Sequence, residues 1–309
     1  MSVVSGEQDN SAIRTRNNMS TLPLKSLLKD HQLLRTCAFI GGEWIGNNAK
    51  EVFDVLNPAD GSLVSTVARS RDSDVDKAIE HADSAGKTWS KTLASERAVI
   101  LNNWYDLVME NQEDLAQIMT AECGKPLAES RGEIVYAASF LKWFAEEGKR
   151  VYGDIIPEVR HGQRILVMKQ PIGVAALITP WNFPSAMITR KVGPALAAGC
   201  TVVCKPSEDT PLSALALAEL GARAGIPDGV FNVVTGSRSD AVAIGNTLSS
   251  HPKIRKVSFT GSTAVAKTLL KQCSSTMKKV SLEAGGNAPF IVFEDADIDR
   301  AVQGKFSSL

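Results

Sequence analysis

The chain has 309 residues, of which 34 are basic and 34 are acidic, so its formal net charge is zero. A balanced charge gives no overall field that would draw the chain to nucleic acid or to an anionic membrane surface. No apolar stretch approaches the roughly 18 residues that a membrane span requires. These properties argue against nucleic-acid and membrane partners, and they predict a soluble protein of one large or two ordinary domains with a small-molecule ligand.

The five cysteines form no Cys-x-x-Cys pair, and none lies among histidines at metal-ligand spacing. This usage predicts a reducing compartment and no metal site. The first residues carry both signs of charge and lack the apolar core of a secretory signal. We therefore expect a cytoplasmic protein, with a mitochondrial location as the alternative, and a disordered N-terminal tail over residues 1–35.

The first half of the chain is expected to be mainly helical. Apolar runs at 39–45 and 51–56, broken by Gly and Asn, predict a short antiparallel pair of strands. Apolar residues at helical spacing then follow in three stretches. They are Val75, Ile79 and Ala82, then Ile100, Trp104, Leu107 and Val108, and then Ile134, Ala138, Leu141 and Trp143. The last of these helices should end near Gly148.

The second half alternates apolar runs with helical patterns. The run at 170–179 is nearly continuous, which is typical of a strand buried on both faces of a parallel sheet. Further runs lie at 200–204, 230–234 and 257–259, and helical patterns lie at 212–224, 240–248 and 263–270. This alternation predicts a doubly wound α/β layer, whose ligands bind beyond the carboxyl ends of the strands.

Four polar motifs lie next to the apolar runs of this layer. They are Thr179-Pro180-Trp181-Asn182-Phe183-Pro184, Lys205-Pro206-Ser207-Glu208-Asp209-Thr210-Pro211, Phe259-Thr260-Gly261-Ser262-Thr263 and Ser281-Leu282-Glu283-Ala284-Gly285-Gly286-Asn287-Ala288-Pro289. Taken singly, each has a structural alternative, such as a rigid turn or a solvated charge pair. Together and in this order they resemble the aldehyde dehydrogenase family over about residues 39–302. The segments 188–191 and 285–293 resemble its succinate-semialdehyde branch.

The resemblance implies an aldehyde dehydrogenase-like α/β fold. We expect a doubly wound, parallel-sheet NAD-binding domain over residues 36–285, with the first oligomerisation hairpin near 150–170. Residues 286–309 would be only the beginning of a catalytic domain. Members of the family are homo-oligomers, so this chain is expected to lack part of the interface.

The resemblance also implies a reaction, in which a cysteine thiolate attacks an aldehyde, the tetrahedral adduct gives hydride to nicotinamide, and water then hydrolyses the thioester. Asn182 matches the amide that donates to the developing oxyanion. Glu283 matches the general base, a role suited to a water-poor pocket, and a helix-capping glutamate is the alternative. Arg190 matches the partner of the substrate carboxylate, and a surface arginine is the alternative.

NAD is the expected cofactor, with NADP as the alternative. Lys205 and Glu208 match the residues at the adenine ribose, where a carboxylate binds the hydroxyls and repels a 2′-phosphate. Gly261 and Ser262 begin a helix whose N-terminus suits a pyrophosphate, although Ser262 could be a plain helix cap. The resemblance adds a further set of cofactor-binding residues. They are Thr179, Pro180, Trp181, Ser207, Gly236 and Ala284.

The sequence departs from the family pattern at three points. Ala284 replaces a leucine, Ala266 replaces a glycine, and no cysteine follows Cys273, although the family has its nucleophile in a Gly-Gln-x-Cys segment beyond Glu283. We therefore expect a chain truncated before the catalytic cysteine. Two functions follow: oxidation of succinate semialdehyde to succinate with NAD(P), in γ-aminobutyrate degradation, or a catalytically silent nucleotide-binding or interaction module.

Overall fold

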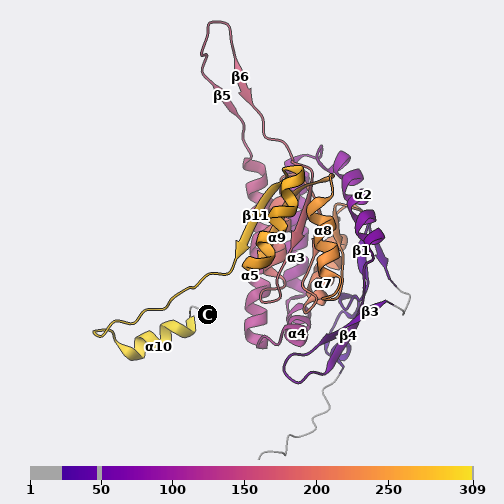
Figure 1. The fold of residues 1–309 in the computed structure, drawn as a ribbon, viewed down its shortest axis with the longest axis vertical. Coiled ribbons are helices and arrows are strands. Elements are labelled where there is room, and N and C mark those ends of the chain that lie inside the picture. The colour runs from indigo at the N-terminus through magenta and orange to yellow at the C-terminus, as the bar shows by residue number, and fades with distance from the viewer. Residues whose placement is uncertain (1–22, 47–50, 308–309) are drawn as a thin grey trace, which may run out of the picture.

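The computed structural model describes residues 23–46 and 51–307 and has an α/β fold built around one large sheet (Figure 1). The sheet has seven strands in the order β11-β10-β7-β8-β9-β1-β2. Strands β7 to β11 are parallel, and β1 and β2 add an antiparallel edge. The strands are β1 Ala38–Ile40, β2 Glu43–Ile45, β7 Val174–Ile178, β8 Thr201–Lys205, β9 Phe231–Val233, β10 Ile254–Gly261 and β11 Lys279–Ala284.

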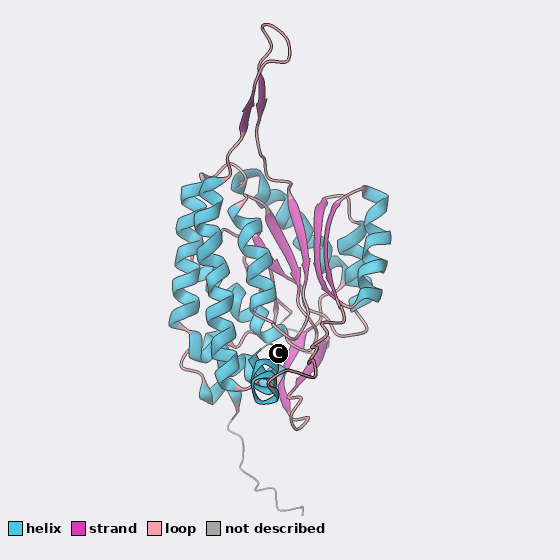
Figure 2. Ribbon diagram, turned by 90° about the vertical axis from the view of Figure 1, so that its left-hand side faces the viewer, coloured by secondary structure: helices cyan, strands magenta, loops and turns pink. Residues whose placement is uncertain are grey.

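Helices cover both faces of this sheet, which confirms the doubly wound architecture (Figure 2). One face carries α3 Ala94–Glu110, α4 Gln112–Cys123, α5 Leu127–Glu147, α6 Ala186–Ala197 and α7 Pro211–Arg223; the other carries α2 Asp72–Trp89, α8 Ala241–Ser250 and α9 Thr263–Cys273. Strand β7 shows why its sequence is apolar throughout. Ala175 and Leu177 pack against the first set of helices, and Val174 and Ala176 pack against the second.

The predicted helical faces are mostly buried: Ile100 and Leu107 are partly buried, and only Trp143 among the predicted residues is exposed. In α5, Ile134, Ala138 and Leu141 are fully buried, as the spacing predicts. Trp143 is 60% exposed, so its place on that face was wrong. Each helical residue turns by about 100°, which puts Trp143 roughly opposite Ile134.

The predicted pairing of 39–45 with 51–56 is also wrong. The first run folds back on itself, because Gly41 and Gly42 both have positive φ and form a tight turn between β1 and β2. The second run, β3 (Val52–Leu56), pairs instead with β4 (Leu63–Ala68), a strand that the periodicity did not reveal.

The segment expected to be a disordered tail is ordered from residue 23 onward. It contains α1 (Leu24–Leu27) and the short helix η1 (His31–Leu33), and Leu28 and Leu33 are buried in the core. The remaining part of the expected tail, residues 1–22, lies outside the described residues.

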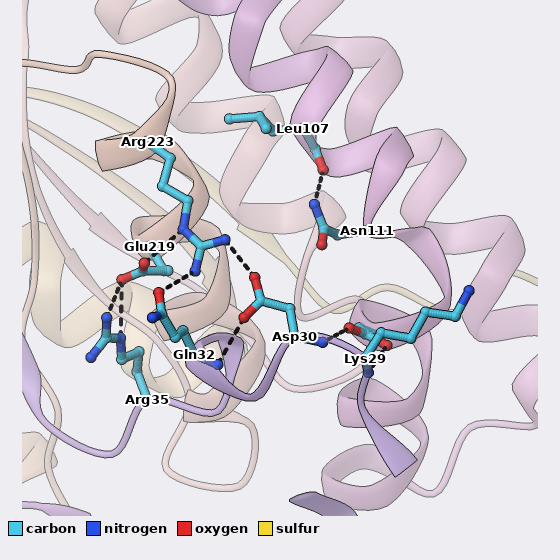
Figure 3. A network of polar contacts seen from close by, with 9 residues as sticks. Lys29, Asp30, Gln32, Arg35, Leu107, Asn111, Glu219 and Arg223 are labelled. Carbon is cyan, nitrogen blue, oxygen red and sulfur yellow. Dashed lines mark hydrogen bonds and ion pairs between the residues drawn. The ribbon is translucent and has the colours of Figure 1, made fainter. Parts of the chain in front are cut away.

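Polar contacts dock this segment on α4 and α7 (Figure 3). The carboxylate of Asp114 accepts hydrogen bonds from the backbone N–H groups of Lys29 and Asp30, at 3.0 and 2.7 Å. Arg223 bridges Asp30 and Glu219, and its hydrogen bond lowers the pKa of Asp30. Several independent bonds therefore hold residues 23–35 in place, none of which leaves a pattern in the local sequence.

Two elements project from the body. Strands β5 (Asp154–Ile156) and β6 (Ile165–Val167) form an antiparallel hairpin inside the expected range 150–170 (Figure 1). After β11 the chain runs away from the sheet to α10 (Ile298–Ser307). The apolar run 290–293 has no regular structure and is exposed, because no described strand lies beside it to supply hydrogen bonds.

No helix in the described part of the chain is long and apolar enough to cross a membrane. Among the same residues, no group of three or more His, Cys, Asp and Glu side chains is arranged to hold a metal ion.

Candidate active site

The strand order creates a switch point between β7 and β10. From β7 the chain proceeds through β8 and β9 in one direction, and β10 then returns to the other side of β7. The loops that leave β7 and β10 therefore diverge, which is where open α/β sheets bind their ligands. The first of these loops carries Asn182, and the second carries Ser262.

A cavity of about 490 Å³ lies at this point. It brings together most of the residues expected at the site, from three segments that are far apart in the sequence. Its lining is Pro180, Trp181, Asn182, Met187, Arg190, Thr260, Gly261, Ser262, Glu283, Ala284 and Gly285. Asn182, Arg190 and Glu283, expected to serve catalysis and substrate binding, thus face one volume.

The cofactor residues expected after β8 and β9 lie outside that lining. Lys205, at the end of β8, is 5% exposed, and its Nζ lies 3.0 Å from Oε2 of Glu208. Burial alone would raise the pKa of Glu208, but the charge of Lys205, a backbone hydrogen bond and the hydrogen bond of Lys205 together outweigh burial and lower it. Glu208 is therefore a charged acceptor beside Lys205, and both residues follow β8, on the other side of β7 from β10.

The other expected residues of this group have local contacts. The N–H of Thr179 donates to the carbonyl of Lys205 at 3.2 Å, which joins the ends of β7 and β8. The hydroxyl of Ser207 accepts from the N–H of Asp209. At Gly236 a Cβ would come within 2.7 Å of Cδ1 of Ile244, so a larger residue in the loop after β9 would require that side chain on α8 to shift.

Glu283 has a different environment from the one expected. It lies on β11 beside Thr260 of β10, and its side chain is exposed. The water-poor pocket inferred for it is therefore not present in the described part of the chain. Arg190 is also exposed, with its guanidinium 5.4 Å above the ring of Phe140.

Lys191 is a site residue that the sequence interpretation missed. Its Nζ donates to the hydroxyl of Ser258 at 3.0 Å, and it lines a second cavity of about 470 Å³ with Arg190 and Glu283. Burial and, to a smaller extent, the charge of Arg190 lower its pKa to about 8, and Glu283 opposes this shift. The segment 188–191 was noted as a motif, but only the packing of α6 on the sheet shows which face Lys191 occupies.

The residues present fit a dinucleotide. The hydroxyls of Thr179 and Thr260 are buried and have no hydrogen-bond partner among the described residues, so each can still bond a ligand. Ser262 does cap α9, accepting from the N–H of Val265 at 3.4 Å. That bond satisfies one N–H of the first turn and leaves the others for an anion.

No cysteine lines the cavity that holds Asn182 and Glu283. Cys204 is fully buried, and burial raises its pKa to about 12. Burial also raises the pKa of Cys123, whose thiol donates to the carbonyl of Trp181 at 3.4 Å. Neither thiol has the exposed, electropositive surroundings that make a thiolate nucleophile.

Comparison with known proteins identifies the family of the chain. The model of the aldehyde dehydrogenase family matches residues 44–309. The chain belongs to the aldehyde dehydrogenase family. Succinate-semialdehyde dehydrogenase [NADP(+)] GabD of Escherichia coli is 59% identical over 281 residues, which are 91% of this chain and 58% of that protein. The mitochondrial succinate-semialdehyde dehydrogenase of Homo sapiens is 54% identical over 276 residues, covering 89% of this chain and 51% of the human protein.

Solved structures of the family have the same fold. An Escherichia coli NADP-dependent enzyme matches with a TM-score of 0.87 and 59% identity, over 91% of this chain and 58% of that one. A betaine aldehyde dehydrogenase from Staphylococcus aureus, solved in complex with NAD+, matches with a TM-score of 0.84 and 33% identity, over 87% of this chain and 55% of that one. The chain thus spans between half and two thirds of the relatives it matches.

Proposed function

We propose that the protein takes part in the NAD-linked oxidation of an aldehyde that carries an anionic group, with succinate semialdehyde as the preferred substrate. The observation that supports this most directly is the single cavity faced by Asn182, Arg190 and Glu283. NAD is preferred to NADP because the ionised Glu208 would repel a 2′-phosphate at the adenine ribose.

The residues of the cavity have distinct roles in this proposal. The side-chain amide of Asn182 donates a hydrogen bond to the aldehyde oxygen as negative charge develops there, which in comparable sites contributes about 3 kcal/mol. Glu283 takes a proton from the water that hydrolyses the oxidised acyl group to the carboxylate. Bound nicotinamide would supply the hydride acceptor, held by the loop at Thr179, Pro180 and Trp181 and by the α9 N-terminus.

Arg190 sets the substrate class. The relatives are named for succinate semialdehyde, glutarate semialdehyde and 3-sulfolactaldehyde, each of which carries an acidic group at a distance from its aldehyde. A guanidinium suits a carboxylate or a sulfonate, because its planar fork donates two hydrogen bonds at once. We propose that the reaction belongs to γ-aminobutyrate degradation, and the similarity to succinate-semialdehyde dehydrogenases supports this proposal. The exposed apolar residues in and beside the β5–β6 hairpin, Ile155, Leu166 and Met168, would serve assembly with other copies.

A nucleotide-binding module without turnover is the second candidate, because no thiol lines the cavity. An aldehyde releases hydride readily only after a nucleophile has made its carbon tetrahedral. For a polypeptide of these 309 residues we therefore expect NAD binding, measured by calorimetry, and no NADH formation with succinate semialdehyde. Turnover at an ordinary rate, abolished by mutating one of the five cysteines, would favour the dehydrogenase over the module; absence of NAD binding would contradict both.

The substrate class is tested by binding alone. Arg190→Ala should weaken the binding of succinate to the NAD-loaded chain about tenfold or more, and it should leave the binding of butyramide unchanged. Arg131→Ala is the matched control, because Arg131 is an exposed arginine that pairs with Glu113 and does not line the cavity. Equal losses for the charged and the uncharged ligand would rule out a carboxylate partner at Arg190.

A further inference from the structure

Residues at the junction between α4 and α5 hydrogen-bond to the backbone of the loop that carries Asn182. The thiol of Cys123, the last residue of α4, donates to the carbonyl of Trp181 at 3.4 Å. Two residues further on, Nζ of Lys125 donates to the carbonyl of Asn182 at 2.8 Å. Both acceptors are backbone atoms of residues whose side chains line the cavity.

Glu133 of α5 holds the other end of the same loop. Its side chain is 1% exposed, and its Oε1 accepts from the N–H groups of Ser185 and Ala186, at 3.0 and 3.2 Å. These two N–H groups begin α6, where the helix dipole favours a negative charge. Its Oε2 forms a short ion pair with Nζ of Lys125.

Lys125 therefore connects the contacts of the α4–α5 junction with those of Glu133 at the start of α6. Its side chain is 12% exposed, and its Nζ also lies 3.9 Å above the ring of Phe183. One ammonium group thus contacts Asn182, Phe183 and Glu133 in a site that little water reaches, where such contacts are stronger than at a surface. The backbone from residue 182 to residue 186 has a fixed position relative to α5 for this reason.

We propose that Lys125 is a positioning residue, which sets where the Asn182 side chain meets the cavity. The proposal rests on the proposed function in one respect, the role of Asn182 toward the aldehyde oxygen. Glu133 keeps two backbone donors and the α6 dipole when Lys125 is removed, so the loss of Lys125 loosens the loop without leaving a wholly uncompensated buried charge. The effect should then be local to residues 181–186.

Lys125→Met tests this, since methionine fills similar space without a charge or a donor. We expect hydrogen exchange at the amides of Ser185 and Ala186, measured without cofactor, to become about tenfold faster or more, while the exchange of the β7 and β8 amides is unchanged. NAD binding, followed by fluorescence of the exposed Trp181, should weaken about fivefold. Lys125→Arg keeps a cation and donors and should restore most of both effects.

Lys142→Met is the control, because Lys142 lies on α5, the helix that carries Glu133, and also has its ammonium group near a ring, that of Tyr105, away from the loop. If Lys125→Met does not fold, Glu133→Gln replaces it, since the amide oxygen can still accept from Ser185 and Ala186 while the ion pair is lost.

The proposal fails if exchange in the loop is unchanged, if it rises equally throughout the chain, or if the arginine variant is no better than methionine. Failure of the unsubstituted chain to bind NAD would contradict the proposed function alone. In that case the exchange data and the arginine rescue still decide whether Lys125 positions the loop.

Discussion

Strands β7 and β11 both supply the candidate site, and they lie in opposite surroundings. Strand β7 is at the centre of the parallel strands, and four of its five residues are buried, with helices on both faces. Strand β11 is at the edge of the sheet and has only Val280 and Leu282 partly buried. The loop after β7 carries Asn182, and β11 itself carries Glu283.

This difference shows that the two halves of the cavity are stabilised in different ways. The half formed by 179–186 is held by the central strands, by α6 and by the α4–α5 junction. The half formed by 283–285 depends on one row of hydrogen bonds to β10 and on a few apolar contacts. An edge strand with one open face is the part of a sheet that most needs a further partner.

The largest expected effect concerns two matched leucines. Leu177→Ala in β7 removes a side chain that is 2% exposed in the main core, and it should lower the free energy of unfolding by about 3–5 kcal/mol. Leu282→Ala in β11 should cost less than about 1.5 kcal/mol, because Leu282 is only partly buried against a small cluster. Denaturant unfolding of both variants measures this, and equal losses would show that the edge is as well packed as the centre.

The second effect is a dependence of stability on pH, which comes from the titration of Lys191. This residue lines the cavity between α6 and the β10–β11 edge. Burial lowers its pKa from 10.5 to about 8, so between these values the unfolded chain binds a proton that the folded chain lacks. The free energy of unfolding should therefore rise with pH in this range. Between about pH 7 and about pH 10, the unsubstituted chain should gain about 1–3 kcal/mol relative to Lys191→Met.

Comparison with the methionine variant removes the contribution of the other lysines to the pH dependence, because both proteins share it. A constant difference between the two proteins across this pH range would mean that Lys191 is well solvated and that the β10–β11 face is more open than its burial indicates.

The smallest effect separates two carboxylates, Glu208 after the central strand β8 and Glu283 on the edge strand β11. Glu208→Ser should change the ratio of NAD to NADP affinity by about tenfold in favour of NADP, because the repulsion of a 2′-phosphate is lost. Glu283→Gln should leave that ratio unaltered. Calorimetric titration with both nucleotides measures it, and a shift with Glu283→Gln alone would place the adenosine end at the edge instead of the centre.

The sequence predicted the elements that are determined by residues close to one another in the chain. A continuous apolar run identifies a strand with helices on both faces, as in β7, and helical spacing identified the buried face of α5 except at Trp143. The position of the 179–184 motif at a strand end was expected because a parallel sheet brings its strand ends to one edge. Asn182 and Glu283 were assigned to the site because their segments resemble the aldehyde dehydrogenase motifs. The same local logic failed at 39–45 and 51–56, where the turn at Gly41 and Gly42 decided the pairing.

Residue types and their order along the chain thus determined the family, the layered fold and the side chains that face the cavity. Whether each of these side chains is exposed, buried or in contact with another charged group was decided only by the tertiary structure. The exposure of Glu283, the burial of Lys191 and the link from Lys125 to Asn182 all depend on contacts between residues far apart in the sequence. Burial and electrostatic strength are properties of the assembled surroundings, so no local pattern of residues contains them.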